Sequence, residues 1–267
     1  MDEQSSLASQ FQSDGVVPLH GIFRQRVLEL EAAIKHAQEH PSPMASAIQD
    51  ESGNVTFFTD FFTYKKNPII DALVRDPELI ETVKNVVHSR ELRLFHDHIL
   101  VKRGEAPETP WHQDRPYYLV DGPISCSVWI TPDYVPLEES LNFIRGSHRT
   151  GLEYSPVAFR DGQIINSESS FRELDDQEIA RLSRNGVLSF SLEPGDALLF
   201  DNRVLHKASR GLQPASRRAL SIRYVGDGAF LTERFVNATP PFNRMGLRVS
   251  EGATLPDVWF PKVSEVS

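Results

Sequence analysis

The sequence lacks the features expected of a secreted, membrane-spanning or nucleic-acid-binding protein. Its one cysteine, Cys126, excludes an intramolecular disulfide and favours a reducing compartment, and the apolar run around it indicates a buried thiol. No apolar run approaches the roughly 18 residues of a membrane span, and the acidic start at Met1–Ser6 does not resemble a signal peptide. A net charge of −9 argues against a nucleic-acid partner, which requires clustered lysine and arginine. These absences predict a cytoplasmic protein without a membrane or nucleic-acid partner.

The composition is that of an ordinary globular protein. Hydrophobic residues make up 40% of the 267 positions and charged residues 24%, so the chain can bury a substantial core. We find no fixed-period repeat and no composition break that would mark a second domain. The sequence therefore predicts a disordered lead-in at 1–10 and a single domain at 11–267, in which the proline-containing tail 239–267 forms an irregular wrap.

The order of local patterns predicts a mainly β fold with flanking helices. Residues 11–19 suggest a short strand, and apolar residues at helical spacing predict a helix from Phe23 to Ala37, ending before Pro41. Asp76, Pro77 and Glu78 form a typical helix start, and 171–184 suggests an exposed helix or ordered loop. Short strands separated by turn residues are predicted at 92–102, 124–131, 141–145, 187–192, 197–200 and 217–225. Several short strands of this kind favour a sandwich or a barrel.

A short motif, His112-Gln113-Asp114, suggests a metal site. Residues at i and i+2 of an extended strand point the same way, so His112 and Asp114 are predicted to bind one ion from the same side. Such a tripeptide arises easily by chance, so the third ligand has to support it. His206 is the best candidate, because it emerges just beyond the buried strand predicted at 197–200, which can support a ligand rigidly. Two histidines and one carboxylate leave coordination positions open, the arrangement of non-haem Fe(II) oxygenases.

An arginine follows the last of these residues at a short distance. Arg217 lies eleven positions after His206 and opens the strand predicted at 217–225. An arginine near the metal can make a bidentate salt bridge to the carboxylate of a small dicarboxylic co-substrate. Arg218 points to the opposite face of the strand if Arg217 points inward.

Together these residues resemble the phytanoyl-CoA dioxygenase family of Fe(II)- and 2-oxoglutarate-dependent oxygenases. The resemblance rests on Trp111–Asp114, Val128–Ile130, Gly146–His148, His206 and Arg217, and it extends from about Phe11 to about Gly228. It implies a double-stranded β-helix, a jelly-roll or cupin-like barrel with N-terminal helices packed on one sheet. It also implies that iron is bound by His112, Asp114 and His206, and that the distal carboxylate of 2-oxoglutarate is bound by Arg217.

Further co-substrate contacts carry over less directly. Relatives place them at positions resembling His96 and His98, and a tryptophan at a position resembling Trp129. Lys102 shares one strand face with both histidines and is assigned with them. The sequence departs from the family after His206, where Lys207-Ala208-Ser209 replaces a commoner glycine and serine and removes a hydroxyl contact at Ala208.

The implied reaction uses Fe(II), 2-oxoglutarate and O2, forms succinate and CO2, and oxidises a small-molecule substrate. Related halogenases have a small residue in place of the carboxylate, so Asp114 favours hydroxylation. Arg115 and Tyr117, directly after the motif, are predicted to contact the substrate. An anionic or polar substrate is suggested by arginines near predicted strand ends, namely Arg115, Arg145, Arg203 and Arg223.

Two other functions fit the same residues. A non-catalytic jelly roll could bind a small ligand, and a hydrolase could hold zinc at the same three side chains. The sequence leaves the substrate and the oligomeric state open.

Overall fold

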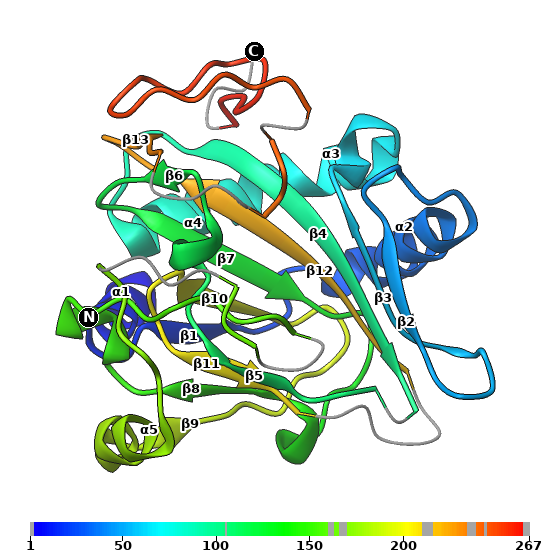
Figure 1. Ribbon diagram of the computed structural model, residues 1–267. Helices are drawn as coiled ribbons and strands as arrows, with labels where there is room; N and C mark the ends of the chain where they lie inside the picture. Colours follow the sequence, from blue (N-terminus) through cyan, green and yellow to red (C-terminus); the bar gives the residue numbers. More distant parts are fainter. Residues whose placement is uncertain are drawn as a thin grey trace.

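Two antiparallel sheets form the body of the protein in the computed structural model, which describes residues 3–104, 106–159, 163–165, 170–209, 216–233, 239–242 and 245–263. Figure 1 shows the larger sheet running diagonally across the molecule and the smaller one below it. The larger sheet has seven strands, in the spatial order β1 (Val16–Leu19), β10 (Ala197–Asp201), β7 (Ser125–Ile130), β12 (Ser216–Val225), β4 (Arg93–Arg103), β3 (Val55–Phe61) and β2 (Ser46–Gln49). The smaller sheet has four, in the order β5 (Thr109–His112), β11 (His206–Ala208), β8 (Leu141–Ile144) and β9 (Val187–Leu188). The short strands β6 (Val120–Asp121) and β13 (Phe230–Leu231) pair separately.

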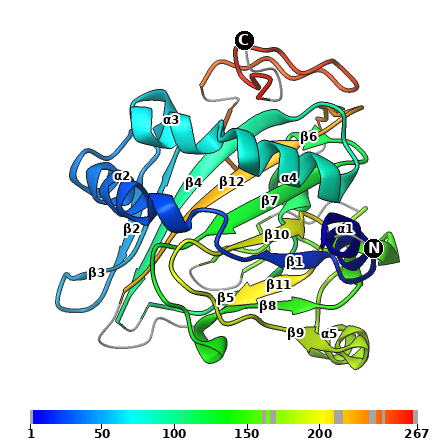
Figure 2. The ribbon, with the colours of Figure 1, turned by 180° about the vertical axis from the view of Figure 1, so that it is seen from behind.

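Four helices cover the outer face of the larger sheet, as Figure 2 shows from behind. They are α1 (Glu3–Asp14), α2 (Val27–Glu39), α3 (Pro68–Val74) and α4 (Pro77–Val87). A fifth helix, α5 (Asp176–Leu182), lies beside β9 in both views. Single turns of 3-10 helix occur at Arg24–Arg26, Thr63–Lys65, Arg115–Tyr117, Leu137–Glu139, Ser147–Thr150 and Ser183–Asn185. No helix in the described ranges has the length and apolar character needed to cross a membrane.

The helix starts follow from local chemistry. The Asp76 carboxylate accepts a hydrogen bond from Leu79 N at 3.0 Å, and Pro77 occupies the first helical position, where no N–H is required. The buried side of α4 then carries its apolar stripe against the sheet. The helix predicted from Asp76 and an ordered helix within 171–184 are confirmed. The helix predicted from Phe23 is confirmed as well, but it begins at Val27, after the 3-10 turn at Arg24–Arg26.

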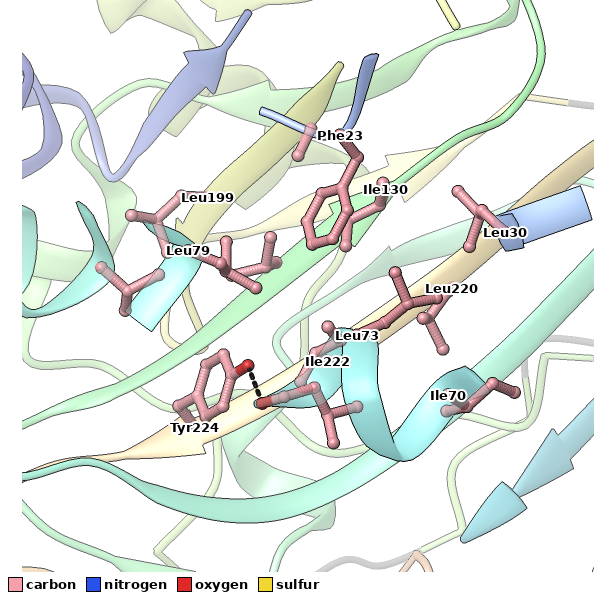
Figure 3. Close-up of a cluster of buried hydrophobic side chains, with 14 of the residues drawn as sticks. Phe23, Leu30, Ile70, Leu73, Leu79, Ile130, Leu199, Leu220, Ile222 and Tyr224 are labelled. Atoms are coloured by element: carbon pink, nitrogen blue, oxygen red, sulfur yellow. Dashed lines mark hydrogen bonds between the residues drawn. The ribbon is translucent and has the colours of Figure 1, made fainter. Parts of the chain in front are cut away.

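Strand β12 connects the helix layer to the interior between the sheets. Its residues Leu220, Ile222 and Tyr224 belong to the core between the larger sheet and the helices, shown in Figure 3. There the Tyr224 hydroxyl donates to the Val74 carbonyl at 2.7 Å. Because side chains alternate along a strand, the odd-numbered residues of β12 point to the other side, between the two sheets. Because the even-numbered apolar residues of β12 pack against the helices, its odd-numbered arginines point into the space between the two sheets.

The N-terminal predictions need correction. Residues 3–10, predicted to be disordered, lie in α1, which continues to Asp14, so the strand predicted at 11–19 shortens to β1. Ala8 and Phe11 are buried, and Phe11 belongs to the core under the helices. Docking on the rest of the protein, rather than a strong amphipathic pattern, accounts for this helix.

Most predicted strands are confirmed within one or two residues, but several strands escaped prediction, among them β2, β3 and the short strand β11. β2 is an exposed edge strand with no apolar face, and β3 has Phe57 and Phe58 buried on opposite faces, so neither alternates in the expected way. The strand predicted at 187–192 ends at Leu188. The described parts of 239–267 contain no helix or regular strand and lie across one end of the larger sheet (Figure 1).

Candidate metal centre and active site

The two histidines of the predicted triad are direct neighbours on adjacent strands. His112 ends β5 and faces His206, the first residue of β11, in the antiparallel register. Their ring centroids lie 4.2 Å apart, and both side chains are buried. Pairing of two short strands thus joins residues that are 94 positions apart in the sequence.

Asp114 completes the group by a different route from the one predicted. It lies beyond the end of β5 with φ −73° and ψ −39°, so the expected extended i, i+2 geometry is wrong. A turn into the 3-10 helix at Arg115–Tyr117 brings its Oδ1 within 3.7 Å of His112 Nε2 and 3.8 Å of His206 Nε2. The ligand atoms of these three residues all lie within 4.8 Å of one another, close enough to bind one metal ion.

Backbone contacts prepare both imidazoles for a metal. His112 Nδ1 lies 2.8 Å from the Pro110 carbonyl and His206 Nδ1 lies 3.1 Å from the Val204 carbonyl. Each Nδ1 therefore carries the proton, which leaves the Nε2 lone pair for an ion. Burial, assisted by the neighbouring His112, lowers the pKa of His206 to about 3 and keeps this ring neutral. Bonds of about 2 Å separate the ligands of one ion by about 3–4 Å, which the distances from Asp114 match.

A second layer of side chains holds the carboxylate of Asp114. Its Oδ2 lies 3.4 Å from Arg223 Nη2 and 3.2 Å from Ser127 Oγ, which is also 2.6 Å from Asn202 Oδ1. Burial alone would raise the pKa of Asp114, but Arg223 and the two histidines outweigh it and hold the pKa well below its ordinary value. Asp114 is thus an ionised ligand whose orientation is set by buried partners.

Arg223 has a role that the motif did not indicate. Its side chain is buried, and Nε donates to the Tyr118 hydroxyl while Nη2 faces Asp114. The usable signal was its spacing, since Arg223 lies six positions after Arg217 and so shares its strand face. Ser127 and Asn202 gave no comparable signal.

The paired strands β4 and β12 carry a ladder of inward-facing residues. The register sets Lys102 opposite Arg217, His98 opposite Ser221, and His96 opposite Arg223. One end of this ladder is cationic and the other approaches Asp114. The predicted co-substrate residues therefore lie in a row that leads to the metal group.

The cationic end is built from buried groups. Arg217 Nη1 donates to the Glu139 carbonyl and, at 3.1 Å, to Ser209 Oγ, so Ser209 supplies a hydroxyl that Ala208 lacks. Lys102 Nζ donates to the Pro107 carbonyl at 2.8 Å and to Thr109 Oγ1 at 3.0 Å. Burial lowers the pKa of Arg217 to about 10. Neither cation has a carboxylate in contact among the described residues, so together they form a natural site for an anionic group.

A single pocket, here called the inner pocket, connects the two ends. The triad lines one part of this pocket and the two buried cations line another, and Trp129, a buried residue of β7, also contributes to the wall. The residues concerned are His112, Asp114, His206, Lys102, Arg217 and Trp129. His98 also lines it. His96 lines instead a neighbouring outer pocket, which is bounded by Phe57, Phe61, His96, Tyr117, Tyr118 and Phe159.

The two residues predicted to contact substrate differ in position. Tyr117 lines the outer pocket, but its hydroxyl donates to the Val157 carbonyl at 2.7 Å and accepts from Val157 N at 2.8 Å. Arg115 pairs with Asp121 at 2.5 Å and with Glu153 at 3.3 Å, and lines neither pocket. Tyr117 thus shapes the outer pocket, while Arg115 supports the structure behind the motif.

We expect Lys102 to make 2-oxoglutarate binding depend on pH. Burial, together with the charge of Arg217, lowers the pKa of Lys102 to about 7. An incoming carboxylate favours the protonated lysine, so affinity declines as the pH rises through 7. The Kd of 2-oxoglutarate, the ligand that the family resemblance implies, should rise about tenfold between pH 6 and pH 8.5. The rise should vanish in Lys102→Met but persist in Lys35→Met, which changes an exposed lysine of α2.

Thermal unfolding gives a second readout that needs no iron. Because folding lowers the pKa of Lys102, its neutral form stabilises the fold at pH above about 10, and this contribution is lost as the pH falls toward 7. Between pH 7 and pH 9 the Tm of the wild type should therefore rise relative to that of Lys102→Met. Parallel Tm curves would contradict the lowered pKa.

Comparisons with known proteins identify relatives of similar sequence and of similar fold. The sequence model of the family described as phytanoyl-CoA dioxygenase matches residues 11–219. Ectoine dioxygenase of Sphingopyxis alaskensis is 24% identical over 221 residues, covering 79% of this chain and 72% of the relative. Ectoine dioxygenase of Nocardia farcinica is 24% identical over 257 residues, covering 91% and 85%.

Solved structures of similar fold include the α-ketoglutarate-dependent epimerase SnoN from nogalamycin biosynthesis. It superposes with a TM-score of 0.79 at 18% identity, covering 99% of this chain and 97% of that one. EctD from S. alaskensis, solved with 2-oxoglutarate and 5-hydroxyectoine, gives a TM-score of 0.69 at 20% identity, covering 86% and 78%. The predicted double-stranded β-helix with flanking helices is confirmed, although the described strands form two separate sheets and no closed barrel.

Proposed function

Because the chain belongs to the phytanoyl-CoA dioxygenase family, we propose that it hydroxylates a small-molecule substrate at an iron held by His112, Asp114 and His206. The chain is a 2-oxoglutarate-dependent non-haem iron dioxygenase. One observation carries the assignment of residues: three buried ligand atoms converge within 4.8 Å at one end of the inner pocket, and two buried cations lie at the other. We further propose that the described residues form one domain.

The side chains along the inner pocket have different roles. Iron, when bound, supplies oxygen activation coupled to the conversion of 2-oxoglutarate to succinate and CO2. Arg217 binds the distal carboxylate of 2-oxoglutarate, with Lys102 contributing charge, and Trp129 and His98 line the wall between this end and the metal. Arg223 and Ser127 orient the Asp114 carboxylate, and the burial of the triad excludes bulk water.

The four arginines that suggested an anionic substrate do not support that prediction. Arg145 pairs with Asp14 at 2.7 Å, Arg203 with Asp201 at 2.5 Å, and Arg223 with Asp114 at 3.4 Å, while Arg115 is held as described above. Each guanidinium already has a carboxylate partner. The outer pocket, which shares Asp114 with the inner one, is the place where the substrate binds.

The protein offers a direct test that needs no knowledge of the substrate. Purified protein with Fe(II), 2-oxoglutarate and O2 should form succinate by uncoupled turnover, measured by mass spectrometry. Omission of O2, or replacement of Fe(II) by Zn(II), should abolish succinate formation. Neither a zinc hydrolase nor a non-catalytic binding protein would form succinate under any of these conditions, because the conversion of 2-oxoglutarate to succinate requires an oxidant.

A further inference from the structure

The outer pocket has aromatic walls. His98 stacks on Phe61 with ring centroids 4.0 Å apart and planes 17° from parallel. His96 meets the edges of the Phe61 and Tyr118 rings at centroid distances of 5.6 and 5.8 Å. Phe159, on the other side, lies 5.6 Å from Tyr117. Walls of this kind favour a flat or bulky apolar molecule.

Among the described residues, the outer pocket offers no unpaired charged group for an ionic ligand. Its described lining includes two charged residues, Asp114 and Arg223, and these pair with each other, with Arg223 Nη2 3.4 Å from Asp114 Oδ2. The Tyr118 hydroxyl accepts from Arg223, and the Tyr117 hydroxyl is occupied on both sides by Val157. A carboxylate or ammonium entering this pocket would lose its hydration without gaining a counter-ion.

Two polar atoms of the pocket walls lack partners. His96 Nε2 and His98 Nδ1 are buried and have no hydrogen-bond partner in the described structure. His96 Nδ1 lies 3.2 Å from the Asp97 carbonyl and therefore carries the ring proton, which makes Nε2 an acceptor. Burial holds the pKa of both rings well below the ordinary value, so they are neutral. Buried polar atoms are nearly always paired, so these two indicate a ligand group.

From these contacts we propose that the outer pocket binds an uncharged, ring-bearing molecule that donates a hydroxyl or N–H hydrogen bond to His96 Nε2. This inference rests on the proposed function, because the bound ring would lie next to Asp114 and hence next to the iron. His96 is then a specificity-determining residue. Its ring selects a hydrogen-bond donor, while the aromatic walls and the internal pairing of Asp114 with Arg223 exclude ions.

Four probes of similar size test the proposal on the full-length protein. They are 2-naphthol, a neutral donor; 2-methoxynaphthalene, an ether without a donor; naphthalene; and 2-naphthoate, an anion. Ligand-observed NMR or calorimetry gives each Kd at pH 7, with the protein as purified and again with Fe(II) and 2-oxoglutarate under argon. We expect 2-naphthol to bind about fivefold more tightly than the ether or naphthalene, as expected for one hydrogen bond, and at least about tenfold more tightly than 2-naphthoate.

Substitution identifies the acceptor. His96→Phe keeps an aromatic ring but removes Nε2, so 2-naphthol should bind it no better than naphthalene does. His36→Phe, the same exchange at an exposed histidine of α2, should keep the wild-type preference. If His96→Phe fails to fold, the difference in affinity between 2-naphthol and its methyl ether on the wild type still tests whether the pocket selects a hydrogen-bond donor.

Several results would overturn the proposal: equal affinity for 2-naphthol and the ether, a preference for 2-naphthoate, or no binding of any of the four. Failure of the proposed function looks different, because it appears as absence of oxygen-dependent succinate formation whichever probe binds. A chain that forms succinate yet prefers 2-naphthoate refutes the inference alone.

Discussion

Replacing Arg217 by glutamine is expected to raise KM for 2-oxoglutarate about hundredfold. The guanidinium is buried at one end of the inner pocket, where it can offer a carboxylate two charge-assisted hydrogen bonds. Each such bond contributes about 1.5–3 kcal/mol, and a factor of one hundred corresponds to about 2.7 kcal/mol. The measurement is the 2-oxoglutarate dependence of succinate formation, which gives KM and kcat separately. Arg217→Lys keeps the charge but loses the planar fork, so an intermediate increase of about tenfold is expected.

The chain offers a control at the next residue. Arg218 lies on the opposite face of β12, where it binds Asp133 and, at 2.7 Å, Glu31. Arg218→Gln should therefore leave KM for 2-oxoglutarate unchanged, although it removes an arginine from the same strand. An equal rise of KM in both variants would point to damage of β12 rather than to a lost carboxylate contact. A fall in kcat of Arg217→Gln at unchanged KM would place the co-substrate elsewhere.

An element of the fold could be predicted from the sequence when the residues that determine it lie close together in the chain. The helix from Pro77 was predictable because its cap, first residue and apolar stripe are all within a few residues of one another. Helix α1 was not, since its burial comes from packing on α4 and the core, which local composition does not reveal. Strand β2 escaped for the same reason, because its place at the sheet edge is defined by pairing with β3.

The site shows the same division. His112 and His206 meet only through the pairing of β5 with β11, a contact that no local pattern encodes and that the family resemblance supplied. The inward direction of Arg217, by contrast, followed from the alternation of side chains along one strand. Arg115 was expected at the substrate because it follows the motif directly, yet the turn after Asp114 directs it to Asp121 and Glu153. Proximity in sequence to a ligand is a poor guide where the chain turns.

Replacing Asp114 by alanine should have the largest effect on the metal centre. The change removes the proposed carboxylate ligand and leaves Arg223, a buried cation, without its carboxylate partner. Disturbing even the supporting contacts of a metal ligand typically costs tenfold to a hundredfold in metal affinity, so the loss of the ligand itself should cost at least about a hundredfold. Anaerobic calorimetry with Fe(II) measures the affinity, and succinate formation should fall below about 1% of the wild-type rate at limiting iron.

A second buried aspartate separates loss of the ligand from loss of stability. Asp201 is also buried and also pairs with an arginine, Arg203 at 2.5 Å, but it is not one of the three clustered ligand residues. Asp201→Ala should therefore lower the free energy of unfolding, as Asp114→Ala does, while retaining Fe(II) affinity. If Asp114→Ala kept wild-type iron affinity and turnover, the assigned ligand set would be wrong. If both variants lost iron equally, the loss would reflect damage to the fold, because Asp201 lies outside the group formed by His112, Asp114 and His206.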